Sequence, residues 1–247
     1  MTNHKMYLKS LLTLVLISII IVNSVAQPAN FVRVRNGKDA TKSISAKERF
    51  QFGQFQNGKL VYTNGKVAQG RLNYCYIMGE VMYIDFKGDT LLIADNNAVD
   101  HAEIGKVFYH ADSENGYQEI IDTIGTIILA KRIQYKIGGT EKKGAYNSQN
   151  DQGSISNAGN YSDPNTGQNV ILPTRNNTVL MRPITFYFLV DGNKRTYKAN
   201  SGNFLKIYAK NKGAVEKFLT EENINFNSEQ DLKKAIEFCN NLGSLKS

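Results

Sequence analysis

Residues 55–95 read FQNGKLVYTNGKVAQGRLNYCYIMGEVMYIDFKGDTLLIAD, and this stretch decides the fold class. Short runs of aromatic and branched side chains alternate in it with turn residues. The turn residues are Asn57-Gly58, Asn64-Gly65, Gly79-Glu80 and Lys87-Gly88-Asp89. Asn-Gly between such runs is a strong hairpin signal, because both central residues of a type I′ turn need a positive φ angle. The stretch therefore predicts consecutive antiparallel strands.

The same pattern extends over residues 49–138, where further short strands are predicted at 99–104, 107–110, 117–121 and 126–137. A sheet made of so many strands tends to curl on itself. We therefore predict a mainly β protein. Its antiparallel meander should form a strongly curved sheet or an open barrel, with a small C-terminal helical segment.

The composition changes after the meander. Residues 139–178 are dominated by Gly, Ser, Asn, Gln and Thr, which bury too little apolar surface to offset ordering, so a flexible loop is predicted. Residues 179–200 predict a β-hairpin that completes the sheet. Residues 201–247 predict a helical tail, in which Leu232, Ala235, Ile236, Cys239 and Leu242 recur three or four positions apart and form one apolar stripe.

The N-terminus has the three parts of a secretory signal peptide. Lys5 and Lys9 precede an apolar run over residues 11–22, and the small residues Ser24 and Ala26 follow it. The run is shorter than the roughly 20 residues that span a bilayer. We predict a signal peptide over residues 1–26 and a polar lead-in over 27–48. The mature protein should then be periplasmic or extracellular, with no membrane span.

Two longer regions resemble a group of uncharacterised exported proteins common in Bacteroidota. The N-terminal one contains FQNGKLVYTNGKVAQGRLNY (55–74), MYIDFKGDTLLIAD (82–95), IGKVFYH (104–110) and EKKGAYN (141–147). The C-terminal one is FLKIYAKNKGAVEKFLTEENINFNSEQDLKKAIEFCNNL (204–242). The resemblance implies export and a β-rich body with a helical C-terminal tail. It implies no activity, because these motifs are turns and helix stripes.

Several kinds of chemistry lack their sequence signature. There is no G-x-S-x-G elbow, and the nucleotide-loop spacing of Gly139 and Gly144 continues with Ala145-Tyr146 in place of the required Lys and hydroxyl residue. Cys75 and Cys239 fall in a strand and on an apolar helix stripe, so they are expected to be unpaired packing residues. The net charge of +8 is scattered among acids, which predicts no nucleic-acid partner.

The hairpin around Gly105-Lys106 is the one candidate for a metal site. A two-residue turn there places His101 opposite His110 and puts Ala102, Ile104, Val107 and Tyr109 on one apolar face. The other face then carries His101, Glu103, His110 and Asp112, with Val99 and Phe108 among them. Opposed Cβ atoms lie about 5 Å apart, so the two imidazoles and a carboxylate could share a zinc ion. The alternative is an ordinary solvated face.

The tyrosines of the meander leave two interpretations open. Tyr62, Tyr74, Tyr76, Tyr83, Tyr109 and Tyr135 could line a ligand cleft on a concave sheet, or they could be half-buried strand packing. Together these features favour a non-enzymatic envelope or secreted protein that binds an unknown macromolecular partner or an apolar ligand on a curved sheet. The alternative is a secreted, hydrolase-like enzyme whose site is assembled from scattered loop residues.

Export predicts cleavage between Ala26 and Gln27. Intact-mass measurement of the exported protein should find a chain that begins at Gln27, because signal peptidase reads the small residues Ser24 and Ala26. A mature product that retains Met1 or residues 11–22 would refute the signal peptide.

Overall fold

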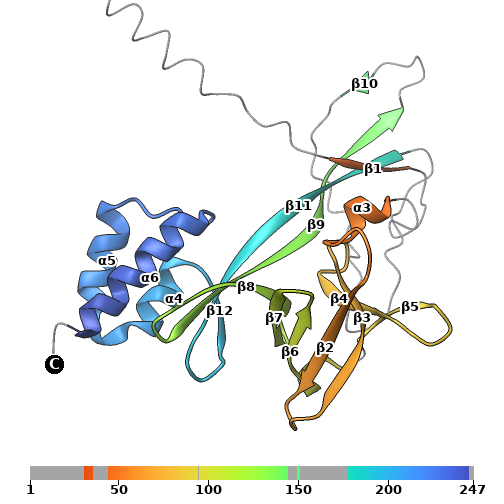
Figure 1. The fold of residues 1–247 in the computed structure, drawn as a ribbon. Coiled ribbons are helices and arrows are strands. Elements are labelled where there is room, and N and C mark those ends of the chain that lie inside the picture. Colours follow the sequence, from red (N-terminus) through yellow and green to blue (C-terminus); the bar gives the residue numbers. More distant parts are fainter. Residues whose placement is uncertain (1–30, 36–43, 94, 144–148, 151–176, 245–247) are drawn as a thin grey trace, which may run out of the picture. The chain divides into compact units, whose positions relative to one another are not determined.

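The computed structural model describes residues 31–35, 44–93, 95–143, 149–150 and 177–244 (Figure 1). Its strands are β1 (Val32–Arg35), β2 (Gln56–Tyr62), β3 (Val67–Cys75), β4 (Glu80–Ile84), β5 (Thr90–Leu92), β6 (Val99–Ile104), β7 (Val107–Asp112), β8 (Gly116–Ile124), β9 (Ile127–Lys143), β10 (Gln149–Asn150), β11 (Asn177–Val190) and β12 (Thr196–Lys198). Its helices are α3 (Ala46–Arg49), η1 (Asn96–Ala98), α4 (Ser201–Ile207), η2 (Ala209–Asn211), α5 (Lys212–Glu221) and α6 (Glu229–Ser244). The predicted signal peptide lies outside the described residues.

All the strands join one 12-stranded sheet. Its order is β1-β11-β9-β8-β7-β6-β2-β3-β4-β5, with β10 beside β9 and β12 beside β11, and every pairing is antiparallel. The sheet does not close into a continuous barrel, because β1 and β5 are its two ends. The predicted fold class, a mainly antiparallel β protein with C-terminal helices, is confirmed.

The connectivity differs from a single meander at one point. Strands β2 to β5 form one meander and β6 to β9 form another, but β6 pairs with β2 and not with β5. The short helix η1 carries the chain back from the β5 edge. Asn57-Gly58 was also predicted as a turn and instead lies inside β2. A Cβ atom on Gly58 would come within 2.4 Å of the Glu103 carbonyl oxygen, so glycine serves close strand packing there.

The predicted loop over residues 139–178 overlaps two strands at its ends. Residues 139–143 belong to β9 and residues 177–178 belong to β11, and these two long strands pair from Asn177 opposite Lys142 to Val190 opposite Ile128. Residues 144–148 and 151–176 lie outside the described part of the chain. The predicted polar lead-in, residues 27–48, contains β1, which pairs with β11, and most of α3.

The C-terminal helices α4, α5 and α6 pack on one end of the long strands β9 and β11 (Figure 1). Buried side chains of α4, α5 and α6, including Phe204, Val215 and Ile236, form a cluster with Leu129 of β9 and Leu189 of β11. The stripe of α6 faces inward as predicted. Asn200 caps α4 by accepting a hydrogen bond from the Asn203 backbone N–H at 2.9 Å.

Neither cysteine is paired within the described chain. Cys239 lies in the helical cluster, whereas Cys75 lies with Phe50 and Met181 in a second buried cluster. Burial raises the pKa of the Cys239 thiol to about 12, which makes it a poor nucleophile. Among the described residues, no helix is long and apolar enough to cross a membrane.

The third cluster fills the inside of the curled sheet, where Leu60 and Leu72 meet Ala102, Ile104 and Tyr109. Strand β9 and the turn after β3 are far apart in the sheet order, but they are in contact here. This contact is called the seam below. The Tyr135 backbone N–H of β9 donates to the Tyr76 carbonyl beyond β3 at 2.8 Å, although β8, β7, β6 and β2 lie between β9 and β3 in the sheet. The sheet is therefore strongly curved.

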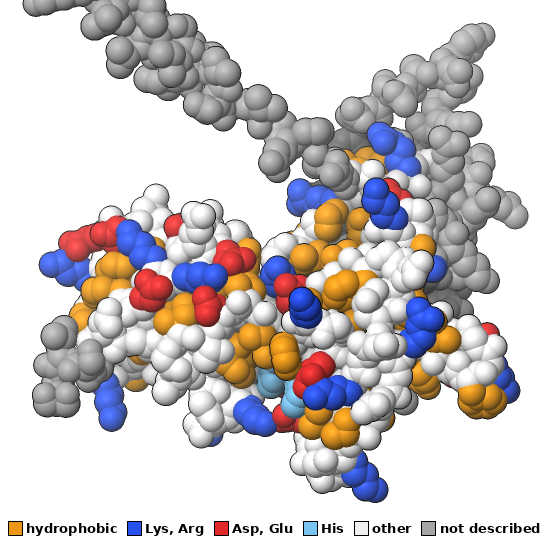
Figure 2. Space-filling model, viewed as in Figure 1, with side chains coloured by type: hydrophobic (Ala, Val, Ile, Leu, Met, Phe, Trp, Pro, Cys, Tyr) orange, Lys and Arg blue, Asp and Glu red, His pale blue; other side chains and the backbone are white. Residues whose placement is uncertain are grey.

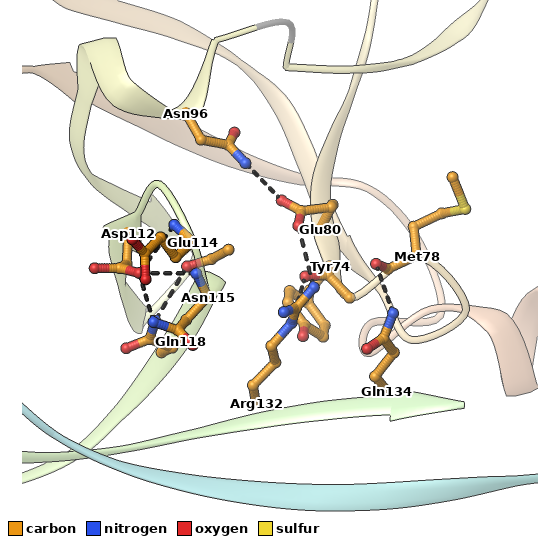
Figure 3. Close-up of polar contacts among 12 residues, drawn as sticks. Tyr74, Met78, Glu80, Asn96, Asp112, Glu114, Asn115, Gln118, Arg132 and Gln134 are labelled. Atoms are coloured by element: carbon orange, nitrogen blue, oxygen red, sulfur yellow. Dashed lines mark hydrogen bonds and ion pairs between the residues drawn. The ribbon is translucent and has the colours of Figure 1, made fainter. Parts of the chain in front are cut away.

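A buried ion pair lies at this seam (Figure 3). The Arg132 guanidinium of β9 donates to Glu80 Oε1 at 3.2 Å and to the Gly79 carbonyl at 3.2 Å, and both charged side chains are largely buried. Two turn glycines make room for it. Gly79 and Gly116 have φ angles of 67° and 65°, and a Cβ atom on Gly116 would lie 2.5 Å from Glu80 Oε1.

Substituting Gly116 by Ala should destabilise the protein. The positive φ angle costs roughly 1–2 kcal/mol for a residue with a Cβ atom, and the methyl group also displaces the ion pair. We expect the free energy of unfolding in guanidinium chloride to fall by about 2 kcal/mol or more. Gly70→Ala is the control, because a Cβ atom at Gly70 meets nothing within 4 Å, and its effect should stay within about 0.5 kcal/mol. Equal effects of the two substitutions would contradict this account of the seam.

Candidate functional site

An apolar groove of about 780 Å³ lies over β2, β3, β4 and β5. The sheet register builds it, because Leu72 of β3 stands opposite Tyr83 of β4, and Tyr83 stands opposite Leu91 of β5. These side chains therefore share one face. The described residues that line it are Leu60, Tyr62, Ala68, Gln69, Gly70, Leu72, Tyr83, Ile84, Asp85, Phe86, Leu91, Ile93, Asp95 and Ala98.

The groove continues the core inside the curled sheet. Leu60 and Leu72 belong to that core, and Tyr62, Tyr83 and Ile93 pack against it. The Glu80 end of β4 lies at the closed seam, whereas the Ile84 end lies in the groove wall. The groove therefore lies toward the Ile84 end of β4, on the side where the curled sheet is not closed.

Glycine and an exposed aromatic ring shape the opening. Gly70 leaves the groove open, because a Cβ atom there would have no neighbour within 4 Å. Phe86 lies in the turn after β4 and is 93% exposed, although it is among the lining residues.

The two acids of the groove are used in local turns. Asp85 Oδ1 accepts hydrogen bonds from the backbone N–H groups of Lys87 and Asp89, each at 2.9 Å, and Asp95 Oδ1 accepts one from Asn97 at 2.9 Å. No histidine, cysteine, lysine or arginine is among the described lining residues. The ionisable side chains of the described lining are those of Asp85, Asp95, Tyr62 and Tyr83.

The two interpretations of the tyrosines apply to different residues. Tyr62 and Tyr83 line the groove, as a ligand cleft requires. Tyr74 and Tyr109 are core residues whose rings stack at 5.4 Å, and Tyr109 donates its hydroxyl hydrogen to Gln51 Oε1 at 2.7 Å. Tyr76 and Tyr135 lie in or against the second buried cluster.

The histidine hairpin has the predicted register. His101 pairs with His110 and Ile104 pairs with Val107, and the predicted apolar face is packed in the core. Val99 was predicted to lie on the polar face, and this prediction was wrong. The register between β2 and β6 shifts at Asp100, so Val99 turns into the core and the Asp100 carboxylate lies beside His101.

The polar side chains of this hairpin bind one another and a distant turn. His101 Nδ1 lies 2.9 Å from Asp100 Oδ2, and its Nε2 lies 3.4 Å from Glu103 Oε1. Lys59 pairs with Glu103 at 3.0 Å, and Lys194 of the β11–β12 turn pairs with Asp100. Figure 2 shows the pale-blue histidines bordered by red and blue charged side chains.

His110 and Asp112 have other partners. His110 Nε2 lies 3.2 Å from the Thr196 hydroxyl of β12, and burial lowers the pKa of this imidazole. Asp112 Oδ1 accepts hydrogen bonds from Glu114 and Asn115 in the β7–β8 turn (Figure 3). The structure therefore brings His101 and Glu103 together, with His110 on the paired strand and Asp112 occupied in a turn.

The described residues contain no cluster of three or more side chains placed to hold a metal ion. The sequence interpretation missed Asp100, Lys59, Lys194 and Thr196. Asp100 joins the group through a β-bulge. Lys59, Lys194 and Thr196 come from strands and turns far away in sequence. The pKa of Asp100 is lowered by a hydrogen bond from Lys194 and, to a smaller extent, by one from His101. Zinc binding by this hairpin stays a prediction.

No known protein family, curated protein or solved structure matches this chain. The resemblance to exported Bacteroidota proteins therefore stays a prediction.

Zinc titration by calorimetry tests the hairpin directly. If His101 and His110 rotate to share an ion with Glu103, the protein should bind zinc with a micromolar dissociation constant, and the His101→Ala, His110→Ala double variant should lose this binding. Absent binding, or binding unchanged in the double variant, would refute the metal site and leave a charged surface.

Proposed function

We propose that this protein is an exported, non-enzymatic binding protein that takes an apolar small molecule into the groove over β2–β5. The observation that carries the proposal is the groove itself, about 780 Å³ in volume and lined mainly by aliphatic and aromatic side chains. Sites for small molecules commonly measure about 300–1,000 Å³ and have such linings. Export rests on the N-terminal sequence, residues 1–26.

A small ligand is favoured over a macromolecular partner by the shape of the site. The lining side chains come from both walls of a hollow that runs into the core, where Leu60 and Leu72 are almost fully buried. Such a hollow can cover one side of a small apolar molecule and remove apolar surface from water. That removal supplies the driving force, at roughly 25 cal/mol for each Å² of apolar surface.

The enzymatic alternative has less support. In the groove, the acids Asp85 and Asp95 serve turns, and at the histidine hairpin the charged groups are paired with one another. A catalytic site would need a base aimed at a place where a substrate can sit. The described residues favour binding over catalysis for this reason.

Filling the groove should weaken binding. Nile red, a neutral apolar dye, should gain fluorescence with the exported protein. Gly70→Leu should weaken its binding at least about tenfold, because the new side chain occupies the hollow. Gly53→Leu is the matched control, since Gly53 is also exposed, has an open Cβ position and lies outside the groove. The proposal is wrong if the dye does not bind or if both variants bind it like the parent protein.

A further inference from the structure

We infer that the edge of β11 between β1 and β12 binds a short, extended, acidic segment of another protein, which adds to the sheet as an extra strand. This is a second site, and it does not depend on the groove. Three observations carry the inference, namely an open stretch of the β11 edge, the direction of its main-chain groups and the sign of the charges at its two ends.

The open stretch is defined by the pairing of β11. Along one edge, β11 pairs with β9 from Asn177 to Val190. Along the other edge, β1 pairs with residues 178–181 and β12 pairs with residues 188–190. Among the described residues, no strand pairs with residues 182–186 on this second edge (Figure 1). These five residues are called the open edge below.

The main chain of the open edge presents hydrogen-bonding groups outward. The Tyr187 carbonyl faces the β12 side, because it accepts a hydrogen bond from the Ala199 N–H at 2.8 Å. Every second residue of an antiparallel strand turns its N–H and C=O to the same side, and the register has no shift over residues 181–190. The N–H and C=O of Thr185 and the C=O of Pro183 therefore point outward. No hydrogen bond to these groups is found among the described residues.

The length of the open edge selects a short segment. A strand rises about 3.3 Å for each residue, so five residues leave about 17 Å between β1 and β12. The β11 strand of a second copy has 14 residues and would run into β1 and β12. It would also place its own Arg182 close to the cations of the first copy, which opposes pairing of like edges. A short segment whose ends turn away from the sheet fits the space.

The two ends of the open edge are positively charged. Arg182 and Lys198 are exposed, and neither forms an ion pair with a described residue. Lys198 stands opposite Phe188, and its Nζ lies 5.6 Å from the centre of the Phe186 ring. Because side chains alternate along a strand, Arg182 lies on the same face as Phe186. One face of the open edge thus has a cation at each end.

The stretches of strand that border the open edge contain no acid. β1 reads VRVR, β12 reads TYK, and residues 132–136 of β9, which pair with the open edge, read RIQYK. Between the two cations, this face carries Ile184 and Phe186. An added strand with the pattern acid-x-apolar-x-acid would place one acid opposite Arg182, the apolar residue opposite Ile184 and the second acid within reach of Lys198.

A titration with defined peptides tests the inference. The probe is acetyl-Ser-Glu-Thr-Val-Thr-Glu-Ser-amide, and its counterpart has Lys in place of both Glu residues. By NMR, the Glu peptide should bind the protein with a dissociation constant of roughly 100 μM or tighter, and at least about tenfold more tightly than the Lys peptide. The bound peptide should also slow hydrogen exchange of the Thr185 amide, because this N–H gains an acceptor.

Two pairs of variants separate the open edge from general charge attraction. Thr185→Pro removes the outward N–H and should abolish binding, whereas Thr185→Val keeps it and should bind like the parent protein. The Arg182→Glu, Lys198→Glu double variant should prefer the Lys peptide. The Lys210→Glu, Lys212→Glu double variant is the matched control, because both lysines are exposed outside the sheet and the net charge changes equally. Its preference for the Glu peptide should not change.

Several results would overturn the inference. The open edge is not the site if the Glu peptide does not bind, or if a folded Thr185→Pro variant binds it like the parent protein. If Thr185→Pro does not fold, as judged by circular dichroism, the reversed preference of the Arg182→Glu, Lys198→Glu variant decides. Equal losses in the Lys210→Glu, Lys212→Glu control would show general attraction. A Thr185 amide already protected in the free protein would show that the chain itself covers this edge.

Discussion

The buried ion pair between Glu80 and Arg132 is the constraint on which the rest of the structure depends. Glu80 begins β4 and Arg132 belongs to β9, and five strands separate β4 from β9 in the sheet. The two side chains can meet only if the sheet curls through the strands between them. Because both are largely buried, separating them would leave an unpaired charge out of water, which costs several kcal/mol.

The seam and the groove are two consequences of the same curvature. At the seam, the Tyr74 hydroxyl donates to the Ile133 carbonyl and Gln134 donates to the Met78 carbonyl, so polar groups fasten β9 to the turn between β3 and β4 (Figure 3). Farther along β4 the apolar face continues without such a fastening. The inside of the curled sheet becomes accessible there, and the groove forms between β2 and β5. A fully closed barrel would have buried this face.

The sequence predicted the local parts of this structure well. The register of His101 with His110 followed from a two-residue turn and from alternation, because both are properties of adjacent residues. Contacts between distant residues were not predictable in this way. The Glu80–Arg132 pair, the return of β6 to β2 and the Lys194 contact with Asp100 depend on how the sheet curls, which no local pattern encodes. The groove was half predicted, since its tyrosines were named but not separated from those of the core.

A double-mutant cycle on Glu80→Gln and Arg132→Met tests most directly whether the seam holds the curled sheet together. Chemical unfolding of the protein gives the free energy of unfolding for each variant. The account predicts that each single substitution lowers the free energy of unfolding by about 3–5 kcal/mol, and that the double variant loses far less than the sum, because no unpaired charge remains. Small, additive losses would show that the pair does not hold the sheet in its curled form.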